Sequence, residues 1–208
     1  MNSVVLYFMG MSGQWFTWFV NEHDEHFSST KRTIDQGEYK EYGIEPRLYL
    51  NNNEESRVVL KDPYLTTDAP FCCTIYGPHT MDPSTVVMLP DVLTAFKINK
   101  VISLRAKKHK HIVKLMATRL VTIKSNWGAS CSEFINKFTE HNYDITRSTR
   151  ILQDNNINVL DYDITSFLNK DEDAYAELCV FLNVTPMHNW KTLVDNMLRD
   201  AYNYETQQ

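Results

Sequence analysis

Residues 3–20 read SVVLYFMGMSGQWFTWFV, and this stretch decides the fold. Its first part, up to the glycine, is almost entirely apolar, β-branched or aromatic, which is typical of a strand buried on both faces. A turn with two glycines follows, and after it apolar residues recur at close to helical spacing. A strand, a glycine-containing turn and a helix form the first half of a βαβ unit.

The same alternation continues to the end of the chain. Further strands are expected at residues 71–76, 100–104 and 158–162. Helices are expected, in chain order, at residues 89–96, 107–124, twice within 130–153, at 173–182 and at 190–202. Residues 28–66 are polar and predict an irregular excursion with one or two short helices or strands. The pattern predicts one α/β domain over residues 1–208, in three layers, with a central, mostly parallel sheet of about four to five strands.

The composition excludes several classes of protein. Hydrophobic residues make up 43% and charged residues 23% of the 208 residues, which excludes wholesale disorder, collagen and coiled coil. The net charge of −5 is opposite in sign to that of proteins that bind nucleic acid non-specifically, so no nucleic-acid partner is expected. No apolar stretch approaches the roughly 20 residues that span a bilayer, and no membrane partner is expected.

The four cysteines indicate the compartment. Cys72 and Cys73 are adjacent in an apolar run, and no two cysteines have the C-x-x-C spacing. This spacing disfavours a zinc site and a disulfide framework, and it suits the reducing cytoplasm. Because apolar residues begin at Val4 without a preceding basic region, the N-terminus indicates a strand rather than a signal peptide.

The turn Gly10–Gln14 is the first candidate site. In an open parallel sheet, ligands bind beyond the carboxyl ends of the strands, which is where this turn lies. Its backbone N–H groups can hold a phosphate at a helix N-terminus, and Ser12 adds a hydroxyl. The turn is not a Walker A loop, because its spacing is shorter and no Gly-Lys-Ser/Thr follows. A plain tight turn between a strand and a helix is the alternative.

Basic residues follow the strand at 100–104. Arg105 comes directly after that strand, so its guanidinium can point into a site. Four lysines come next in the chain, at Lys107, Lys108, Lys110 and Lys114. On an acidic protein, such a cluster can form an anion-binding rim. For the lysines, the solvated face of a surface helix is the alternative.

Histidines are candidates for acid–base or metal chemistry. His79 follows the strand at 71–76 in the turn Tyr-Gly-Pro-His, where an imidazole is placed to act as a general base. His23 and His26 are three residues apart on an expected helix. A metal would need further ligands, none of which is evident, so no metal site is expected.

Four segments in this order resemble the sulfotransferases of the cytosolic, bacterial or viral type, whose donor is 3′-phosphoadenosine 5′-phosphosulfate. Residues 4–20 are similar to the family's strand, phosphosulfate loop and helix, with the pattern P-K/R-S-G-T/S-T-W. Residues 75–90 are similar to its K-T-H-L-P region, and residues 100–113 to its strand that ends in R-x-P-x-D. Residues 158–184 are similar to the segment that closes the family's fold.

The resemblance implies a P-loop-like sulfotransferase fold and transfer of a sulfuryl group from the donor to a hydroxyl or amine acceptor. His79 falls on the family's catalytic base, and Arg105 falls on its ligand for the donor's 3′-phosphate. The resemblance implies no metal. It places the donor's 5′-phosphosulfate against Gly10, Met11, Ser12, Gly13, Gln14 and Trp15.

The chain departs from the family pattern in the loop. Met11 stands where the family has a Lys or Arg that neutralises the bridging oxygen of the transferred group. Losing one such group typically costs about 10²–10³ in rate. The alternative hypothesis is a catalytically inactive sulfotransferase-like fold that serves as a binding or assembly protein, in which Arg105 forms a structural ion pair with Asp161 or Asp163.

A third hypothesis is a nucleotide kinase-like P-loop protein. It shares the strand, loop and helix, but this chain has no Gly-Lys-Ser/Thr. Its magnesium carboxylate would have to be Asp161 or Asp163, and we rank this hypothesis last.

The partners differ between the two main hypotheses. An enzyme needs a small-molecule or glycan acceptor, whose pocket we expect at residues 28–66 and around Trp127. A binding protein would instead assemble with further copies of itself or with components of a virus particle. A short, cysteine-poor chain that starts at its first strand fits a bacterial or viral protein, located in the cytoplasm of its cell or host, or in the virion.

Overall fold

The computed structural model describes residues 2–7, 10–25, 47–49, 59–60, 70, 72–76, 90, 93–94, 97–124 and 128–203. Within these ranges, one sheet contains the strands β1 (Asn2–Leu6), β2 (Arg47–Tyr49), β3 (Val59–Leu60), β4 (Cys72–Tyr76), β5 (Ile98–Arg105) and β6 (Asn158–Asp163). Their order is β3-β2-β4-β1-β5-β6. All neighbouring strands are parallel except β2 and β3.

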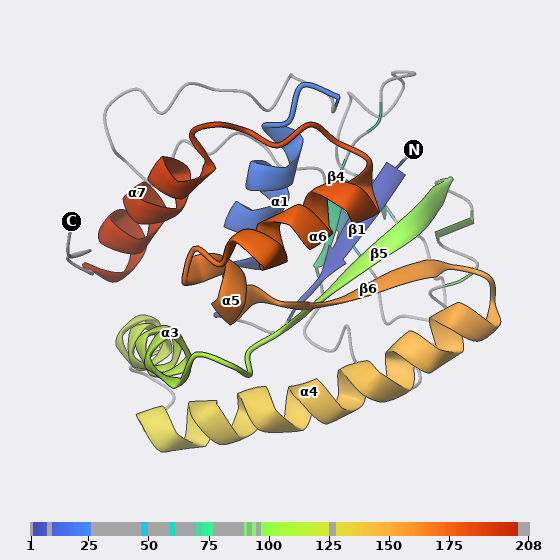
Figure 1. Cartoon of the computed structure of the whole chain (residues 1–208). Helices are drawn as coiled ribbons and strands as arrows, with labels where there is room; N and C mark the ends of the chain where they lie inside the picture. The colour runs from blue at the N-terminus through green and yellow to red at the C-terminus, as the bar shows by residue number, and fades with distance from the viewer. Residues whose placement is uncertain are drawn as a thin grey trace.

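Helices cover both faces of this sheet. They are α1 (Gly13–Asn21), α3 (Lys110–Ile123), α4 (Cys131–Asp154), α5 (Ile164–Leu168), α6 (Glu172–Leu182) and α7 (Trp190–Tyr202). Figure 1 shows α4 along one side of the sheet, with α1, α5 and α6 along the other. The predicted α/β fold with a central, mostly parallel sheet is therefore confirmed. Four of the six described strands, β1, β4, β5 and β6, are those expected individually, and β2 and β3 lie within residues 28–66, where one or two short helices or strands were expected.

Two helices differ from the sequence expectation. Residues 131–154 form one helix, where two were expected. This helix begins with a capping box between Ser130 and Glu133, contains no glycine or proline, and buries Phe134 and Phe138 on one face. The short helix α5 was not expected, since five residues are too few to show a helical period. The helix expected at 89–96 lies largely outside the described residues.

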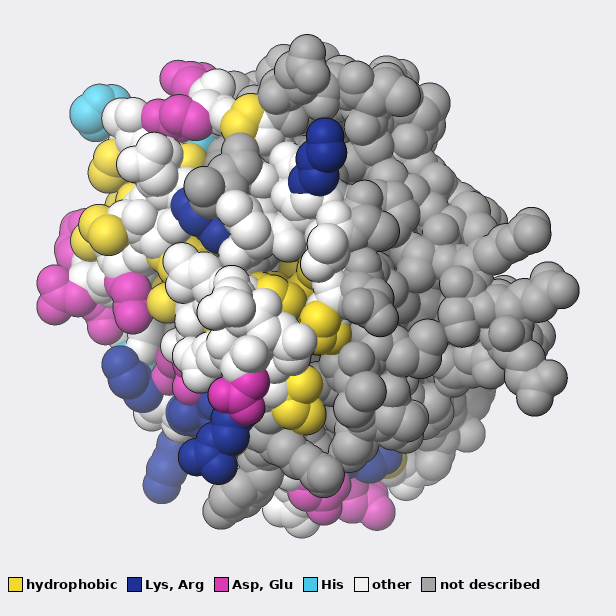
Figure 2. All heavy atoms as spheres, turned by 90° about the vertical axis from the view of Figure 1, so that its right-hand side faces the viewer, with side chains coloured by type: hydrophobic (Ala, Val, Ile, Leu, Met, Phe, Trp, Pro, Cys, Tyr) yellow, Lys and Arg dark blue, Asp and Glu magenta, His cyan; other side chains and the backbone are white. Residues whose placement is uncertain are grey.

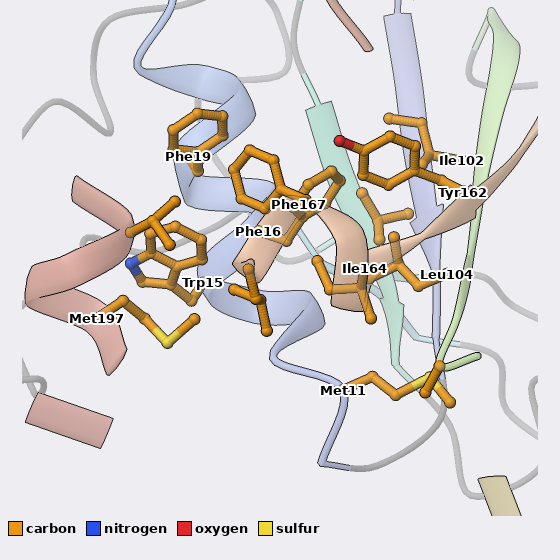
Figure 3. Close-up of a cluster of buried hydrophobic side chains, with 14 of the residues drawn as sticks. Met11, Trp15, Phe16, Phe19, Ile102, Leu104, Tyr162, Ile164, Phe167 and Met197 are labelled. Atoms are coloured by element: carbon orange, nitrogen blue, oxygen red, sulfur yellow. The ribbon is translucent and has the colours of Figure 1, made fainter. Parts of the chain in front are cut away.

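An aromatic cluster forms the core between α1 and the helices that follow β6. The rings of Phe19 and Phe167 lie 4.8 Å apart, and those of Tyr175 and Trp190 lie 4.4 Å apart. Figure 3 shows Trp15, Phe16 and Phe19 of α1 facing this cluster. Buried rings of this size contribute strongly to the hydrophobic stabilisation of the fold, and here they attach α1 to α5, α6 and α7.

The two faces of β5 have different neighbours. Ile102 and Leu104 belong to the cluster that contains α1 (Figure 3). Arg105 instead contacts α4, because successive side chains of a strand point to opposite faces of the sheet. The side chain of Arg105 therefore leaves the sheet on the face opposite α1.

None of the described helices is long and apolar enough to cross a bilayer. On the face drawn in Figure 2, the described hydrophobic side chains form small groups among polar and charged ones.

The turn between β1 and α1 depends on close packing at its glycines. Gly10 has a φ of +89°, which favours glycine, and a Cβ there would lie 2.4 Å from a Leu120 methyl carbon of α3. At Gly13, a Cβ would lie 2.1 Å from the ring of Tyr7. Both positions therefore require a residue without a side chain.

We expect Gly10→Ala to lower the free energy of unfolding by about 2–5 kcal/mol, from left-handed strain and from the clash with Leu120. Gly128→Ala is the matched control: Gly128 also has positive φ, at +64°, but a Cβ there would meet no atom within 4 Å. The control should lose only about 1–2 kcal/mol from strain. Denaturant unfolding of both variants measures this difference, and equal losses would show that the turn is not packed tightly on α3.

Candidate functional site

The β1–α1 turn has the backbone geometry of an anion site. Gly10 and Ser12 both have positive φ, at +89° and +56°. The helix α1 begins at Gly13, and the Ser12 side chain does not cap it. The hydroxyl of Ser12 instead shares a hydrogen bond with the phenol of Tyr202, at the end of α7. The first N–H groups of α1 are therefore left without a side-chain cap from Ser12, at the carboxyl end of a central strand.

The position of this turn follows from the order of the strands. β1 lies between β4 and β5, and the chain runs from β1 to β2 on the β4 side. From β4 the chain then crosses to β5, on the other side of β1. Ligands of open parallel sheets bind where the direction of the connections reverses in this way. The sheet therefore places the turn at the location where a ligand is expected.

The side chains of the turn are less open than its backbone. Met11 is 0% exposed and Trp15 is 2% exposed. Figure 3 shows both within the hydrophobic cluster, with Trp15 beside Met197 of α7. Of the predicted loop residues, Ser12 and Gln14 are partly exposed. Met11 and Trp15 can therefore contribute only backbone groups to a ligand.

Arg105 is held by α4 and β6. It is 5% exposed, and its Nη1 donates to the Asn142 carbonyl oxygen at 2.6 Å and to the Thr146 hydroxyl at 2.8 Å. Its Nε forms an ion pair with the carboxylate of Asp161 on β6. The structure does not bring the Arg105 side chain together with the β1–α1 turn, because it extends to the opposite face of the sheet.

Side chains fix the backbone that follows β5. Asn142 exchanges two hydrogen bonds with Ala106: the Ala106 N–H donates to its Oδ1, and its Nδ2 donates to the Ala106 carbonyl oxygen, both at 3.2 Å. The carboxylate of Asp163 accepts the N–H groups of Lys107 and Lys108, at 3.2 and 2.9 Å. These N–H groups are therefore engaged within the protein. An anion at this loop can meet the lysine side chains and the N-terminal end of α3, whose N-cap His109 forms no side-chain cap.

The lysines of the predicted anion-binding rim lie on the surface of the protein. The side chains of Lys107, Lys108, Lys110 and Lys114 are exposed. The helix α3 has no acidic residue in its first turn, so the rim is positive along its N-terminal end. This arrangement agrees equally with the predicted anion-binding rim and with a solvated helix.

The remaining histidine and carboxylate candidates have these positions. His79 lies outside the described residues. His23 is 0% exposed, with Nδ1 3.0 Å from the Val20 carbonyl oxygen and Nε2 3.2 Å from the Tyr175 hydroxyl, so it has a structural role.

Asp161 and Asp163 are engaged as described above, which disfavours the magnesium site of the kinase-like hypothesis. No group of three or more His, Cys, Asp or Glu in the described ranges could hold a metal ion.

Two residues of this site were missed by the sequence analysis. Tyr202 reaches Ser12 across 190 positions of the chain. Arg119 of α3 lies with its guanidinium carbon 4.9 Å from the centre of the Tyr202 ring. No local pattern links residues so far apart in the chain, although Arg119 stands out as a basic residue on the partly buried side of an amphipathic helix.

Comparison of the chain with protein-family models, with curated proteins and with solved structures finds no match. The function is therefore inferred from the residues of this chain alone.

The ion pair of Arg105 predicts a structural role for Asp161. We expect Asp161→Asn to lower the free energy of unfolding by about 1–3 kcal/mol, because it leaves a buried guanidinium without its counter-charge. Glu172→Gln removes a carboxylate from the exposed pair with Lys191 and should cost less than about 1 kcal/mol. Denaturant unfolding measures both. An unchanged stability of Asp161→Asn would show that Arg105 is free to bind a ligand.

Beside Arg105, His141 predicts a pH dependence. It is 3% exposed, and burial, together with the charge of Arg105, lowers its pKa from 6.5 to about 4, although a hydrogen bond with the Leu104 backbone opposes this shift. The unfolded chain therefore binds a proton that the folded protein does not. We expect a loss of about 3 kcal/mol as the pH falls from 6.5 to about 4, and no further loss from this group below that pH.

Denaturant unfolding across this pH range measures the effect. His141→Leu should remove this part of the pH dependence, whereas the control His188→Leu, at an exposed position, should retain it. The same slope in the wild type and in His141→Leu would contradict the assignment.

Proposed function

We propose that this protein is a sulfotransferase-like protein that binds 3′-phosphoadenosine 5′-phosphosulfate at the β1–α1 turn and transfers its sulfuryl group to a hydroxyl or amine acceptor. The observation that carries the proposal is the turn itself, in which Gly10 and Ser12 are left-handed and α1 starts without a side-chain cap. Helix N-termini of this kind bind phosphate and sulfate through their N–H groups and their dipole. The position of the turn at the reversal of strand order adds support.

The proposed reaction makes specific demands on this site. The acceptor oxygen or nitrogen attacks sulfur, and the bond from sulfur to the bridging phosphate oxygen breaks. Adenosine 3′,5′-bisphosphate leaves, and the acceptor proton passes to a base, which by resemblance is His79. Negative charge develops on the bridging oxygen, so a nearby positive group is worth several kcal/mol in the transition state, on the order of 3–4.

A second candidate function is supported by Met11. Its side chain is fully buried, so the turn itself supplies no side-chain cation to the bridging oxygen. The ion pair of Arg105 with Asp161 adds to this, since the family's position for the 3′-phosphate ligand is engaged within the protein. Both observations favour the inactive sulfotransferase-like fold, used as a binding or assembly protein.

Calorimetric titration with adenosine 3′,5′-bisphosphate tests the first proposal without knowledge of the acceptor. We expect saturable binding that Ser12→Ala weakens by about 2- to 10-fold, the effect of one neutral hydrogen bond. Ser132→Ala, at an exposed position of α4, is the control and should bind as the wild type does.

Each outcome of this titration separates the two candidates. Binding that Ser12→Ala weakens places the ligand at the turn. A folded wild type that binds no bisphosphate at millimolar concentration would overturn the donor site and leave the inactive fold as the better proposal.

A further inference from the structure

Three elements that are distant in the sequence meet at the β1–α1 turn. Leu120 of α3 lies so close to Gly10 that a Cβ at position 10 would be 2.4 Å from its methyl carbon. Tyr202 of α7 hydrogen-bonds with Ser12 through its hydroxyl. Arg119 directly precedes Leu120 and has its guanidinium carbon 4.9 Å from the centre of the Tyr202 ring. The helix that packs on the turn through Leu120 therefore also carries Arg119, which contacts Tyr202.

The turn lacks positive charge of its own. The stretch from Gly10 to Gln14 contains no lysine or arginine, and Met11 points into the core. Arg119 of α3 contacts the ring of Tyr202, and the hydroxyl of Tyr202 contacts Ser12, so these contacts link a cation to the turn.

The phenol of Tyr202 stays neutral and can donate a hydrogen bond. Burial raises the pKa of Tyr202 and outweighs the interactions with the Ser12 hydroxyl and the Arg119 guanidinium, which act in the opposite direction. A hydroxyl, a guanidinium and the positive end of a helix are the groups that recognise phosphate and sulfate oxygens in proteins. Here the Ser12 hydroxyl and the Arg119 guanidinium both contact Tyr202, and Ser12 is the N-cap residue of α1.

We propose that Arg119 is the ligand-binding cation of the β1–α1 turn, supplying from α3 the positive charge that Met11 does not, and that Arg119, Tyr202 and Ser12 form one subsite for a phosphate or sulfate group. The inference rests on the proposed donor site and adds a binding residue to it. Arginine suits this role because its planar guanidinium can stack on the Tyr202 ring and present N–H groups to an anionic oxygen at the same time.

Calorimetric titrations of the full chain with adenosine 3′,5′-bisphosphate and, separately, with inorganic pyrophosphate test the proposal. We expect Arg119→Gln to weaken binding of the bisphosphate by about 10- to 100-fold, the effect of a charge-assisted hydrogen bond. Arg119→Lys should lose less, since it keeps the charge. The matched control is Arg199→Gln, which removes the same charge from an exposed side chain of α7 and should change affinity by less than about twofold.

The outcomes distinguish this inference from the proposed function. If the wild type binds the bisphosphate and both glutamine variants bind it equally well, Arg119 is not a ligand, although the donor site stands. If the wild type binds only pyrophosphate, and Arg119→Gln abolishes this binding, the subsite stands and the adenosine donor is wrong. If the folded wild type binds neither probe, both proposals are overturned. Thermal unfolding of each variant confirms that the partly exposed position of Arg119 leaves the fold intact.

Discussion

The contact of a left-handed turn with α3 is the constraint on which the rest of the site depends. Gly10 approaches Leu120 more closely than any residue with a side chain could, and Gly13 does the same against Tyr7. This approach starts α1 directly above the end of β1 and turns Met11 inward, where it is fully buried. One backbone conformation therefore decides both what the turn can offer to a ligand, its N–H groups, and what it cannot offer, a charged side chain.

The same division between backbone and side chain recurs at the end of β5. There the N–H groups of Lys107 and Lys108 are accepted by Asp163, and Ala106 is paired with Asn142. An anion that approaches this second loop meets charged side chains, and beyond them the N-terminal end of α3, which has no side-chain cap from His109. These two loops are thus chemically different: the β1–α1 turn offers left-handed backbone at Gly10 and Ser12 but no basic side chain, whereas the loop after β5 offers exposed lysines.

The sequence was sufficient for features that depend on local periodicity. The strands β1, β4, β5 and β6 and the helices α1, α3, α6 and α7 all overlap the predicted ranges. Some of them, such as β1 and β5, are buried along almost their whole length, and others, such as α3, bury one face in a regular pattern. The helix α4 was wrongly divided in two, since the polar stretch around Asn142 interrupts its apolar pattern, although that residue is used to hold Ala106. The helix α5 was too short for any period to be visible, whereas β2 and β3 lie in the range where one or two short helices or strands were expected.

The candidate site was only partly predictable, for a different reason. The turn is visible as two glycines after a strand, but the direction of Arg105 depends on whether one position faces α1 or α4, and a shift of one residue reverses that face. The hypothesis that Arg105 pairs with Asp161 was one of two alternatives, and the structure contains that pair. The contact between Tyr202 and Ser12 depends on how α7 packs through Trp190, Val194 and Met197, which no local pattern reveals.

Binding and catalysis make different demands on this fold, and the difference explains how one structure supports two candidate functions. Binding of a phosphosulfate needs N–H groups and a positive potential, which a helix N-terminus provides in the ground state. Catalysis needs a positive group that interacts more strongly as charge develops on the bridging oxygen. With Met11 in the core, that group has to come from outside the turn. Arg119 of α3, which adjoins the leucine packed on Gly10, is the residue that we propose for this role, so the same helix that packs on the turn would also supply its charge.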